Sequence, residues 1–240
     1  CYELNFEGAR LAKAATTEYT AKNPDKPRFV AGSVGPTNQT ASMLADINNP
    51  GARRAVFDDF YDAYYDQIKG LADGGADLLL IETITDALNC KAALKAYSDL
   101  TDIDEEKYGL PIMISVTIID KSGRTLAGQT LEAFQIAVGH TKNLLSIGLN
   151  CSLGPKEMRP FIRNISEIAP EFVSLYPNAG LPNEFGDYDE SPENMARILE
   201  EYVQDGFLNI IGGCCGTTPD HIKALVEVAE RNQPRQIPII

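Results

Sequence analysis

The sequence of 240 residues lacks tryptophan, has only two histidines, and contains no apolar run long enough to cross a bilayer. A membrane-spanning helix needs roughly 18 or more consecutive apolar residues, so we predict that no helix spans a membrane. His140 is expected at the end of a helix and His221 just inside the start of another, so neither supports a Ser-His-Asp triad, and the Gly-x-Ser-x-Gly motif is absent. Serine hydrolases are therefore disfavoured.

Basic residues are also few. The chain has 21 Lys and Arg against 34 Asp and Glu, which gives a net charge of −13. A field of this sign repels phosphate backbones and anionic lipid headgroups. Nucleic acids and membrane surfaces are therefore excluded as expected partners.

Cysteine is scarce as well, with five residues in the chain: Cys1, Cys90, Cys151, Cys214 and Cys215. An odd number in a chain of this length does not suit a disulfide scaffold. We therefore predict a cytoplasmic protein with free thiols, in which clustered thiols bind metal or catalyse a reaction. The first residues have no signal-peptide pattern and no starting Met, so we expect that an upstream segment is absent.

Six apolar stretches, each followed by a helical pattern, predict a fold of alternating strands and helices. The strands are expected at 29–36, 78–83, 111–117, 146–151, 172–178 and 208–213. The helices are expected at 5–19, 57–71, 85–97, 130–140, from about 155, 191–204 and 220–231. Strict alternation indicates parallel strands joined by helical crossovers.

Two architectures fit this pattern: a doubly wound open sheet or a (β/α)8 TIM barrel. The first strand–helix turn, residues 32–36, lacks the Gly-x-Gly-x-x-Gly spacing of dinucleotide-binding sheets. A barrel needs eight strands, and the sequence supplies about six behind an unpaired helix. We predict one α/β domain over residues 1–240, an N-terminally incomplete barrel that lacks the first strand–helix unit and the second strand.

Two loops interrupt the pattern. Residues 101–107 form a polar, acidic loop, and residues 179–190 are rich in Gly, Pro, Asn and acidic side chains. A loop of about 12 residues in a compact domain is long enough to suggest a function such as lining a site.

The carboxyl ends of parallel strands are where such folds hold their chemistry. The predicted strand ends carry Ser33, Gly35, Glu82, Thr83, Ser115, Thr117, Asn150, Cys151, Asn178, Cys214 and Cys215. Three of the five cysteines thus fall on one rim, although Cys151 is far from the other two in sequence.

Cys151, Cys214 and Cys215 are candidate metal ligands. Three thiolates and one further group suit tetrahedral Zn²⁺, and soft sulfur favours zinc over magnesium or calcium. A zinc ion with an open fourth position can hold a substrate thiol deprotonated at neutral pH. The alternative is that these cysteines are only small buried hydrophobic residues. Spacing without a local Cys-x-x-Cys does not decide between the two.

Three other residues have more than one interpretation, and a fourth, Cys90, has one. A carboxylate at Glu82, in an apolar strand, needs a partner, which is either a substrate ammonium group or a Lys or Arg. Asn178 could orient substrate, contact the metal or form a turn. His221, just inside a helix start, is expected at the surface or behind the metal ligands, and Cys90 is expected to pack as a hydrophobic residue.

Several segments resemble the zinc-dependent homocysteine S-methyltransferase family. The segments that carry this resemblance are Gly148–Cys151 and Gly212–Pro219. Closer similarity to one branch, the homocysteine-binding N-terminal domain of cobalamin-dependent methionine synthase, lies in Ala31–Asn38, Leu80–Thr83, Ser122–Leu126 and Pro177–Asn183. The resemblance covers essentially the whole chain. Relatives that use betaine or S-methylmethionine share the cysteines but less of the segments Pro177–Asn183 and Gly216–Pro219.

The resemblance implies a (β/α)8 barrel in which Cys151, Cys214 and Cys215 hold Zn²⁺, with Asn178 as a candidate fourth ligand. It implies that Glu82 binds the amino group of homocysteine. Ser33, Thr117 and Asn178, at other strand ends, complete the candidate substrate site. The implied reaction transfers a methyl group from methylcobalamin to homocysteine and forms methionine. Cobalamin and methyltetrahydrofolate are expected on other domains of the same polypeptide.

Two motifs of the family do not occur in this sequence: Asp-Gly-(Gly/Ala)-Met-Gly-Thr on the first strand and Glu-Thr-Asn-Thr on the second. The resemblance therefore implies a complete zinc site beside a partial substrate cradle, and we expect weak homocysteine binding by these 240 residues. Two alternatives stay open. One is a homocysteine methyltransferase with S-methylmethionine or betaine as donor, and the other is a non-catalytic zinc-binding remnant.

Overall fold

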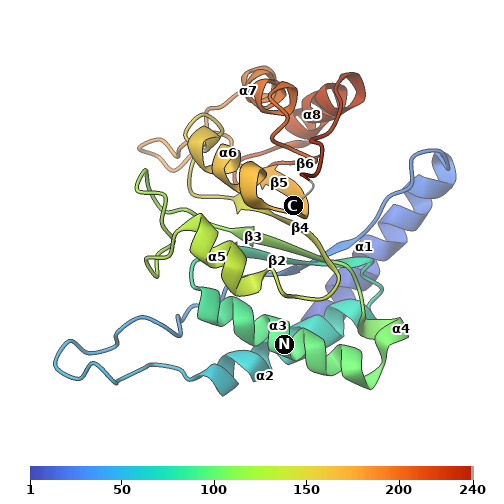
Figure 1. Ribbon diagram of the computed structural model, residues 1–240. Coiled ribbons are helices and arrows are strands. Elements are labelled where there is room, and N and C mark those ends of the chain that lie inside the picture. The colour runs from blue at the N-terminus through green and yellow to red at the C-terminus, as the bar shows by residue number, and fades with distance from the viewer. Residues whose placement is uncertain (239–240) are drawn as a thin grey trace. The chain divides into compact units, whose positions relative to one another are not determined.

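The computed structural model describes residues 1–238, in which strands and helices alternate (Figure 1). The strands are β1 (Ala31–Val34), β2 (Leu78–Ile84), β3 (Ile112–Val116), β4 (Leu144–Asn150), β5 (Phe172–Tyr176) and β6 (Ile210–Ile211). The helices are α1 (Tyr2–Lys22), α2 (Phe57–Asp73), α3 (Ala87–Ile103), α4 (Glu105–Tyr108), α5 (Leu131–Val138), α6 (Arg159–Ile168), α7 (Pro192–Gln204) and α8 (Pro219–Arg231).

The six strands follow one another in the sheet in sequence order, β1-β2-β3-β4-β5-β6. The pairs β1–β2, β4–β5 and β5–β6 are parallel. A doubly wound sheet would reverse its order at a switch point, and no reversal occurs among the described strands. Sequential parallel strands with helical crossovers are the pattern of the (β/α)8 barrel, and six is fewer than eight. The predicted fold class, an incomplete TIM barrel, is confirmed.

Within the described residues the chain divides into two compact units. The first comprises Cys1–Met113 with His140–Leu144, and the second comprises Ile114–Gly139 with the chain from Leu145 onward. Strands β3 and β4 contribute residues to both. The assignment of residues 1–240 to one domain stays a prediction.

In the first unit, α1 packs on α2 and α2 packs on α3 (Figure 1). Asp73, at the end of α2, joins three of its helices. Its carboxylate accepts hydrogen bonds from Tyr2 at 2.7 Å and Tyr108 at 3.0 Å, and pairs with Lys69 at 2.5 Å and Lys107 at 2.6 Å. Burial alone would raise the pKa of Asp73, but these donors outweigh it and hold that pKa well below its ordinary value.

In the second unit, β4 and β5 lie unusually close at one point. A Cβ atom on Gly148 would lie 1.9 Å from the backbone oxygen of Ser174. Only glycine allows this approach. The core of this unit is apolar, with Ile147, Leu149 and Leu175 fully buried.

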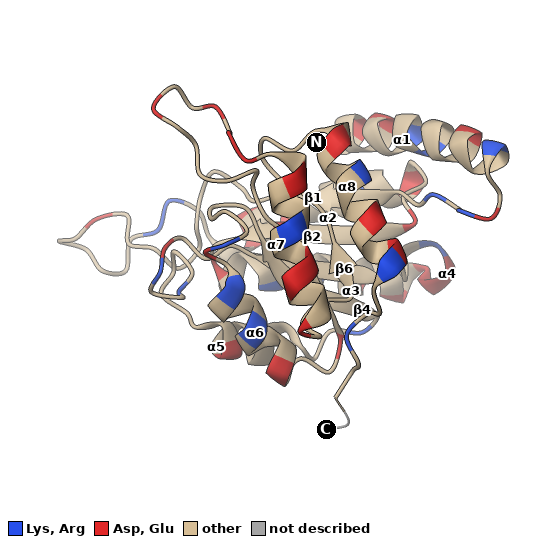
Figure 2. Cartoon of the chain, turned by 90° about the horizontal axis from the view of Figure 1, so that it is seen from above, with Lys and Arg blue, Asp and Glu red and all other residues tan. Residues whose placement is uncertain are grey.

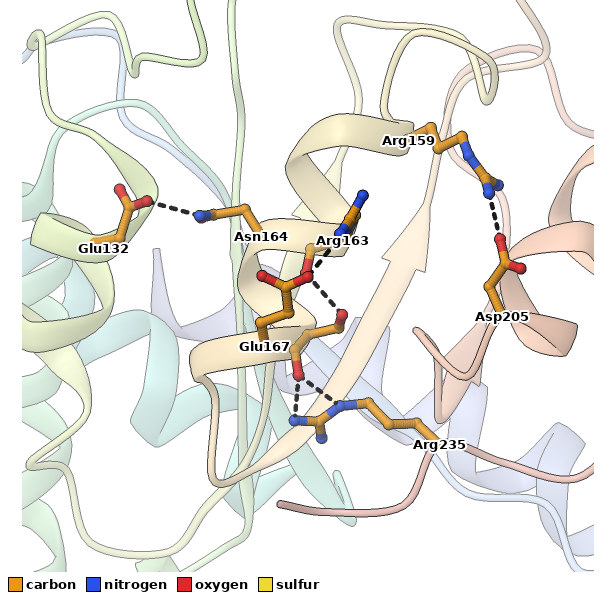
Figure 3. Close-up of polar contacts among 8 residues, drawn as sticks. Glu132, Arg159, Arg163, Asn164, Glu167, Asp205 and Arg235 are labelled. Atoms are coloured by element: carbon orange, nitrogen blue, oxygen red, sulfur yellow. Dashed lines mark hydrogen bonds and ion pairs between the residues drawn. The ribbon is translucent and has the colours of Figure 1, made fainter. Parts of the chain in front are cut away.

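Arg235 anchors the C-terminal segment of the second unit to α6 (Figure 3). The side chain is 4% exposed, and its guanidinium donates to the carbonyls of Ser166, Ala169 and Glu171 at 2.5–3.0 Å. The carbonyl of Ser166 has no helical donor, because the residue four positions later is Pro170. Arg235 therefore supplies the donors that the end of α6 lacks.

The expected element bounds were wrong in three places. The helix expected at 85–97 continues to Ile103, because Leu100 is 1% exposed and extends its buried face. The acidic loop contains the short helix α4, which Asp104 caps through the backbone nitrogen of Lys107. Strand β6 is two residues long, although a longer strand was expected at 208–213. Gly212 still donates its backbone N–H to Leu175 on β5, but it lies outside the regular strand.

Charged residues of both signs are interspersed on the surface of α7 and α8 (Figure 2). The two helices are joined by Arg231, whose guanidinium pairs with both carboxylate oxygens of Glu200. Within residues 1–238, no helix combines the length and apolar character that crossing a membrane requires.

Candidate metal centre

All three candidate cysteines lie in the second unit, and the first of them directly follows β4. Strand β4 ends at Asn150, after which Cys151 and Ser152 have φ angles of 60° and 62°. Two consecutive left-handed residues that are not glycine are strained, by about 1–3 kcal/mol each. The backbone nitrogen of Cys151 still reaches the carbonyl of Tyr176 on β5, at 3.4 Å. The turn thus places the Cys151 side chain at the carboxyl end of β4.

Cys214 and Cys215 follow β6 and are held by backbone bonds to the segment after β5. Cys214 donates its backbone N–H to Pro177 at 2.8 Å, and the carbonyl of Cys215 accepts from Ala179 at 2.9 Å. Gly213 precedes the pair because a Cβ there would lie 2.4 Å from a methyl carbon of Thr217. The two neighbouring thiols therefore occupy a tight turn at the ends of adjacent strands.

The three sulfur atoms lie within 4.8 Å of one another. Sγ of Cys151 is 3.8 Å from Sγ of Cys215, and Sγ of Cys214 is 3.9 Å from Sγ of Cys215. A tetrahedron with Zn–S bonds of about 2.3 Å has edges of about 3.8 Å between its sulfurs. The donor set and its spacing therefore fit a zinc ion with three cysteine ligands and a fourth open position.

The thiols of the cluster share their protons unequally. Hydrogen bonding with Cys214 lowers the pKa of Cys151 to about 5, although burial opposes this shift. The same bond, together with burial, raises the pKa of the Cys214 thiol. The cluster therefore favours the thiolate at Cys151, and a bound cation would favour deprotonation of the other two thiols.

Polar groups surround the sulfurs. The side-chain nitrogen of Asn150 donates to Sγ of Cys214 at 3.8 Å. The side chain of Asn178, which is 2% exposed, accepts from the backbone nitrogen of Cys215 at 3.2 Å and helps to lower the pKa of Cys151. Burial and the neighbouring Cys215 sulfur raise the pKa of the Tyr188 hydroxyl. Each sulfur thus has a polar neighbour from a different segment.

The long loop at 179–190, which carries Tyr188, is fastened at both of its ends. Glu190 donates its backbone N–H to the carbonyl of Ala179 at 3.1 Å. His221 is 5% exposed, and its Nε2 lies 2.9 Å from the carbonyl of Glu190 while its Nδ1 accepts from the backbone nitrogen of Thr218 at 3.1 Å. His221 is therefore buried behind the site, as one of the two predicted alternatives has it, and not at the surface.

The other predicted site residues fall into two groups. In the first unit, Glu82 on β2 accepts a hydrogen bond from the hydroxyl of Ser33 on β1. In the second unit, Thr117 donates its hydroxyl to the carbonyl of Asn150 at 3.0 Å. Cys90 is 1% exposed, and burial raises its pKa to about 12, which agrees with hydrophobic packing.

Sequence reasoning did not assign Tyr188 or the amide of Asn150 to the cluster. The unusual length of the loop at 179–190 was a signal for Tyr188, and the position of Asn150 at a strand end was a signal for its amide. Neither signal indicates which sulfur each residue contacts.

Comparison with known proteins gives a family and a set of related structures. The sequence profile of the family described as homocysteine S-methyltransferase matches residues 1–229. The apo form of the homocysteine methyltransferase MmuM from Escherichia coli superimposes with a TM-score of 0.69 at 24% identity, over 94% of this chain and 72% of that one. Its metallated form gives 0.70 at 24% identity, over 92% and 69%. Its oxidized form gives 0.69 at 25%, over 93% and 70%. At this identity the superpositions show a shared fold.

Proposed function

Because this chain belongs to the homocysteine S-methyltransferase family, we propose that its three-cysteine cluster binds Zn²⁺ and activates the thiol of homocysteine for methylation. The observation that carries the proposal is the sulfur spacing of 3.8 and 3.9 Å. It matches the roughly 3.8 Å edge of a zinc–sulfur tetrahedron. When bound, the zinc supplies a Lewis acid that lowers the pKa of a thiol at the open position.

The chain's own residues prepare this position. Cys151, Cys214 and Cys215 hold the cation, and Asn178 lies beside Cys151 as the candidate fourth ligand. The strand ends hold the three sulfurs together before metal arrives, so binding requires little rearrangement. Tyr188 lies next to Cys215.

We propose that Glu82 and Ser33 receive the amino group of homocysteine. Among the described residues the partner of Glu82 is the Ser33 hydroxyl and not a Lys or Arg. A carboxylate and a hydroxyl are both acceptors for an ammonium group. The hydroxyl of Thr117 is engaged by the backbone of Asn150, so Thr117 is proposed to contact substrate only through the remaining lone pairs of its oxygen.

The proposed methyl donor is methylcobalamin, with methionine as the product. Support comes from the segments Pro177–Asn183 and Gly216–Pro219, which resemble the methionine synthase branch. Cobalamin and methyltetrahydrofolate would then be bound by other domains of the same polypeptide. Five free cysteines support a reducing compartment such as the cytoplasm.

Metal analysis tests the zinc site. Protein purified under reducing conditions is expected to hold about one zinc ion per chain. Cys215→Ser is expected to lose it, whereas Cys1→Ser, at an exposed thiol outside the cluster, is expected to keep it. X-ray absorption should show sulfur coordination rising from about three to about four when homocysteine is added. Absence of zinc from the unmodified chain would overturn the proposal.

A second assay separates the methyl donors. A polypeptide that contains this domain and its neighbours is supplied in turn with methylcobalamin, S-methylmethionine and betaine, and methionine is quantified. Methylation only with cobalamin supports the proposed branch. Methylation only with either small donor would retain the zinc chemistry and reject the cobalamin assignment.

A further inference from the structure

A chain of buried hydrogen bonds leads from β3 to one sulfur of the cluster. Ser115 and Asn150 are each 0% exposed. The hydroxyl of Ser115 donates to Oδ1 of Asn150 at 2.7 Å, and Nδ2 of Asn150 donates to Sγ of Cys214 at 3.8 Å. All three residues belong to the second unit.

The chemistry of each group determines which atom donates and which accepts in this series of hydrogen bonds. A cysteine sulfur that binds a cation is a thiolate and can only accept hydrogen bonds, so the amide must turn its N–H toward it. The amide oxygen then faces Ser115, whose hydroxyl can rotate to donate. The opposite amide orientation would place Oδ1 against a negative sulfur and is disfavoured electrostatically. Ser115 thus favours the one orientation in which Asn150 faces the sulfur with a donor.

The backbone of Asn150 is braced separately. Its carbonyl accepts the hydroxyl of Thr117, on the segment after β3, at 3.0 Å. This bond lies immediately before the left-handed pair Cys151 and Ser152. The segment at the end of β3 therefore holds both the main chain and the side chain of Asn150, at the point where β4 passes into the metal ligands.

We propose that Ser115 and Asn150 are positioning residues of the metal centre, in which Ser115 orients the Asn150 amide so that its N–H stabilises negative charge on the Cys214 sulfur. The inference rests on the proposed zinc function and deepens it. Three cysteine thiolates around one divalent cation carry a net negative charge, and a fourth thiolate increases it. A buried N–H donor offsets part of that charge.

A second buried serine, Ser146, provides a control for Ser115. Ser146, on β4 with Asn150, is also 0% exposed, and its hydroxyl has no hydrogen-bond partner among the described residues. Removing its hydroxyl is not expected to affect the cluster. Ser146→Ala is therefore the matched control for Ser115→Ala, since both replace a fully buried serine in a strand of the same unit.

The first test measures zinc affinity by competition with a chromophoric chelator. Loss of a group behind metal ligands typically weakens binding about 10- to 100-fold, and we expect Ser115→Ala and Asn150→Ala to fall in this range, with Ser146→Ala unchanged. Because Ser115 acts only through Asn150, the double variant should bind no more weakly than Asn150→Ala. In Co²⁺-loaded protein, the sulfur-to-metal charge-transfer band should shift to lower energy in both single variants. Unchanged zinc affinity in both single variants, or additive losses in the double variant, would overturn the proposal that Ser115 acts through Asn150.

The second test needs no metal. The side-chain amide protons of Asn150, identified by their absence in Asn150→Ala, should exchange slowly with solvent in the metal-free chain and faster in Ser115→Ala. If the unmodified chain binds no zinc, the proposed function fails, but this exchange measurement still tests whether Ser115 orients the Asn150 amide. Slow exchange that depends on Ser115 supports the orientation of the amide, and exchange indifferent to Ser115 rejects it.

Discussion

Replacing Arg235 by methionine should destabilise the second unit strongly. Methionine keeps most of the aliphatic volume and removes every donor. Three carbonyls, those of Ser166, Ala169 and Glu171, then lose their guanidinium partner. At about 1 kcal/mol or more for each buried acceptor left without a donor, and with some offset because no cation is buried, the expected loss is about 2–4 kcal/mol.

The assay is urea unfolding followed by far-ultraviolet circular dichroism. With a slope of roughly 2–3 kcal/mol per molar urea, the midpoint of Arg235→Met should fall by about 1 M. Arg163→Met is the control, because Arg163 lies on the surface of α6 and, within residues 1–238, forms its ion pair with exposed Glu167 (Figure 3). That change should cost about 0.5 kcal/mol or less. Equal midpoints for the two variants would refute the argument that Arg235 supplies the donors missing at the end of α6.

Three further changes test other parts of the structure. Gly148→Ala should prevent folding or lower the free energy of unfolding by more than about 3 kcal/mol, because the new Cβ would lie 1.9 Å from a backbone oxygen of β5. Gly8→Ala is the control and should leave stability unchanged, because no atom lies within 4 Å of the Cβ it would add. Similar thermal melts of the two variants by circular dichroism would contradict this prediction. Asp73→Asn should lower the free energy of unfolding by about 2 kcal/mol at pH 7. The folded pKa of Asp73 lies below its ordinary 3.8, so the stability that the ionised carboxylate contributes is complete above pH 3.8 and is lost as the pH falls. The urea midpoints of Asp73→Asn and the unmodified protein should therefore converge in acid. A difference that stays constant with pH would contradict this prediction. His221→Ala should free one end of the loop at 179–190 and accelerate its proteolysis several-fold, and unchanged cleavage would show that the loop is held elsewhere.

The placement of the cysteines was predictable because parallel strands bring their carboxyl ends to one edge, whatever the separation in sequence. A correct assignment of the strands was enough to group Cys151, Cys214 and Cys215. The roles of His221 and Arg235 were not predictable in this way. Both act through backbone carbonyls, which carry no residue identity, so no pattern of side chains indicates where these two residues will bond.

Local signals also failed where tertiary packing decided the outcome. Leu100 extends α3 beyond its expected end because its side chain is buried, although the surrounding residues are weak helix formers. Pro170 was visible in the sequence, and its missing N–H does indicate that Ser166 needs another donor. Which residue supplies that donor is set by the path of the C-terminal segment.

The three clustered cysteines follow two strands, one after β4 and two after β6, and β5 lies between these strands in the sheet. A cation held by all three sulfurs would close a long chain loop, in the manner of a cross-link, and would remove conformational freedom from the unfolded chain. Metal supply would then control how long the second unit survives unfolding and proteolysis, with excess free zinc raising its stability by mass action. If that cation is zinc, as proposed, a shortage of zinc would lower the amount of folded second unit as well as the proposed activity.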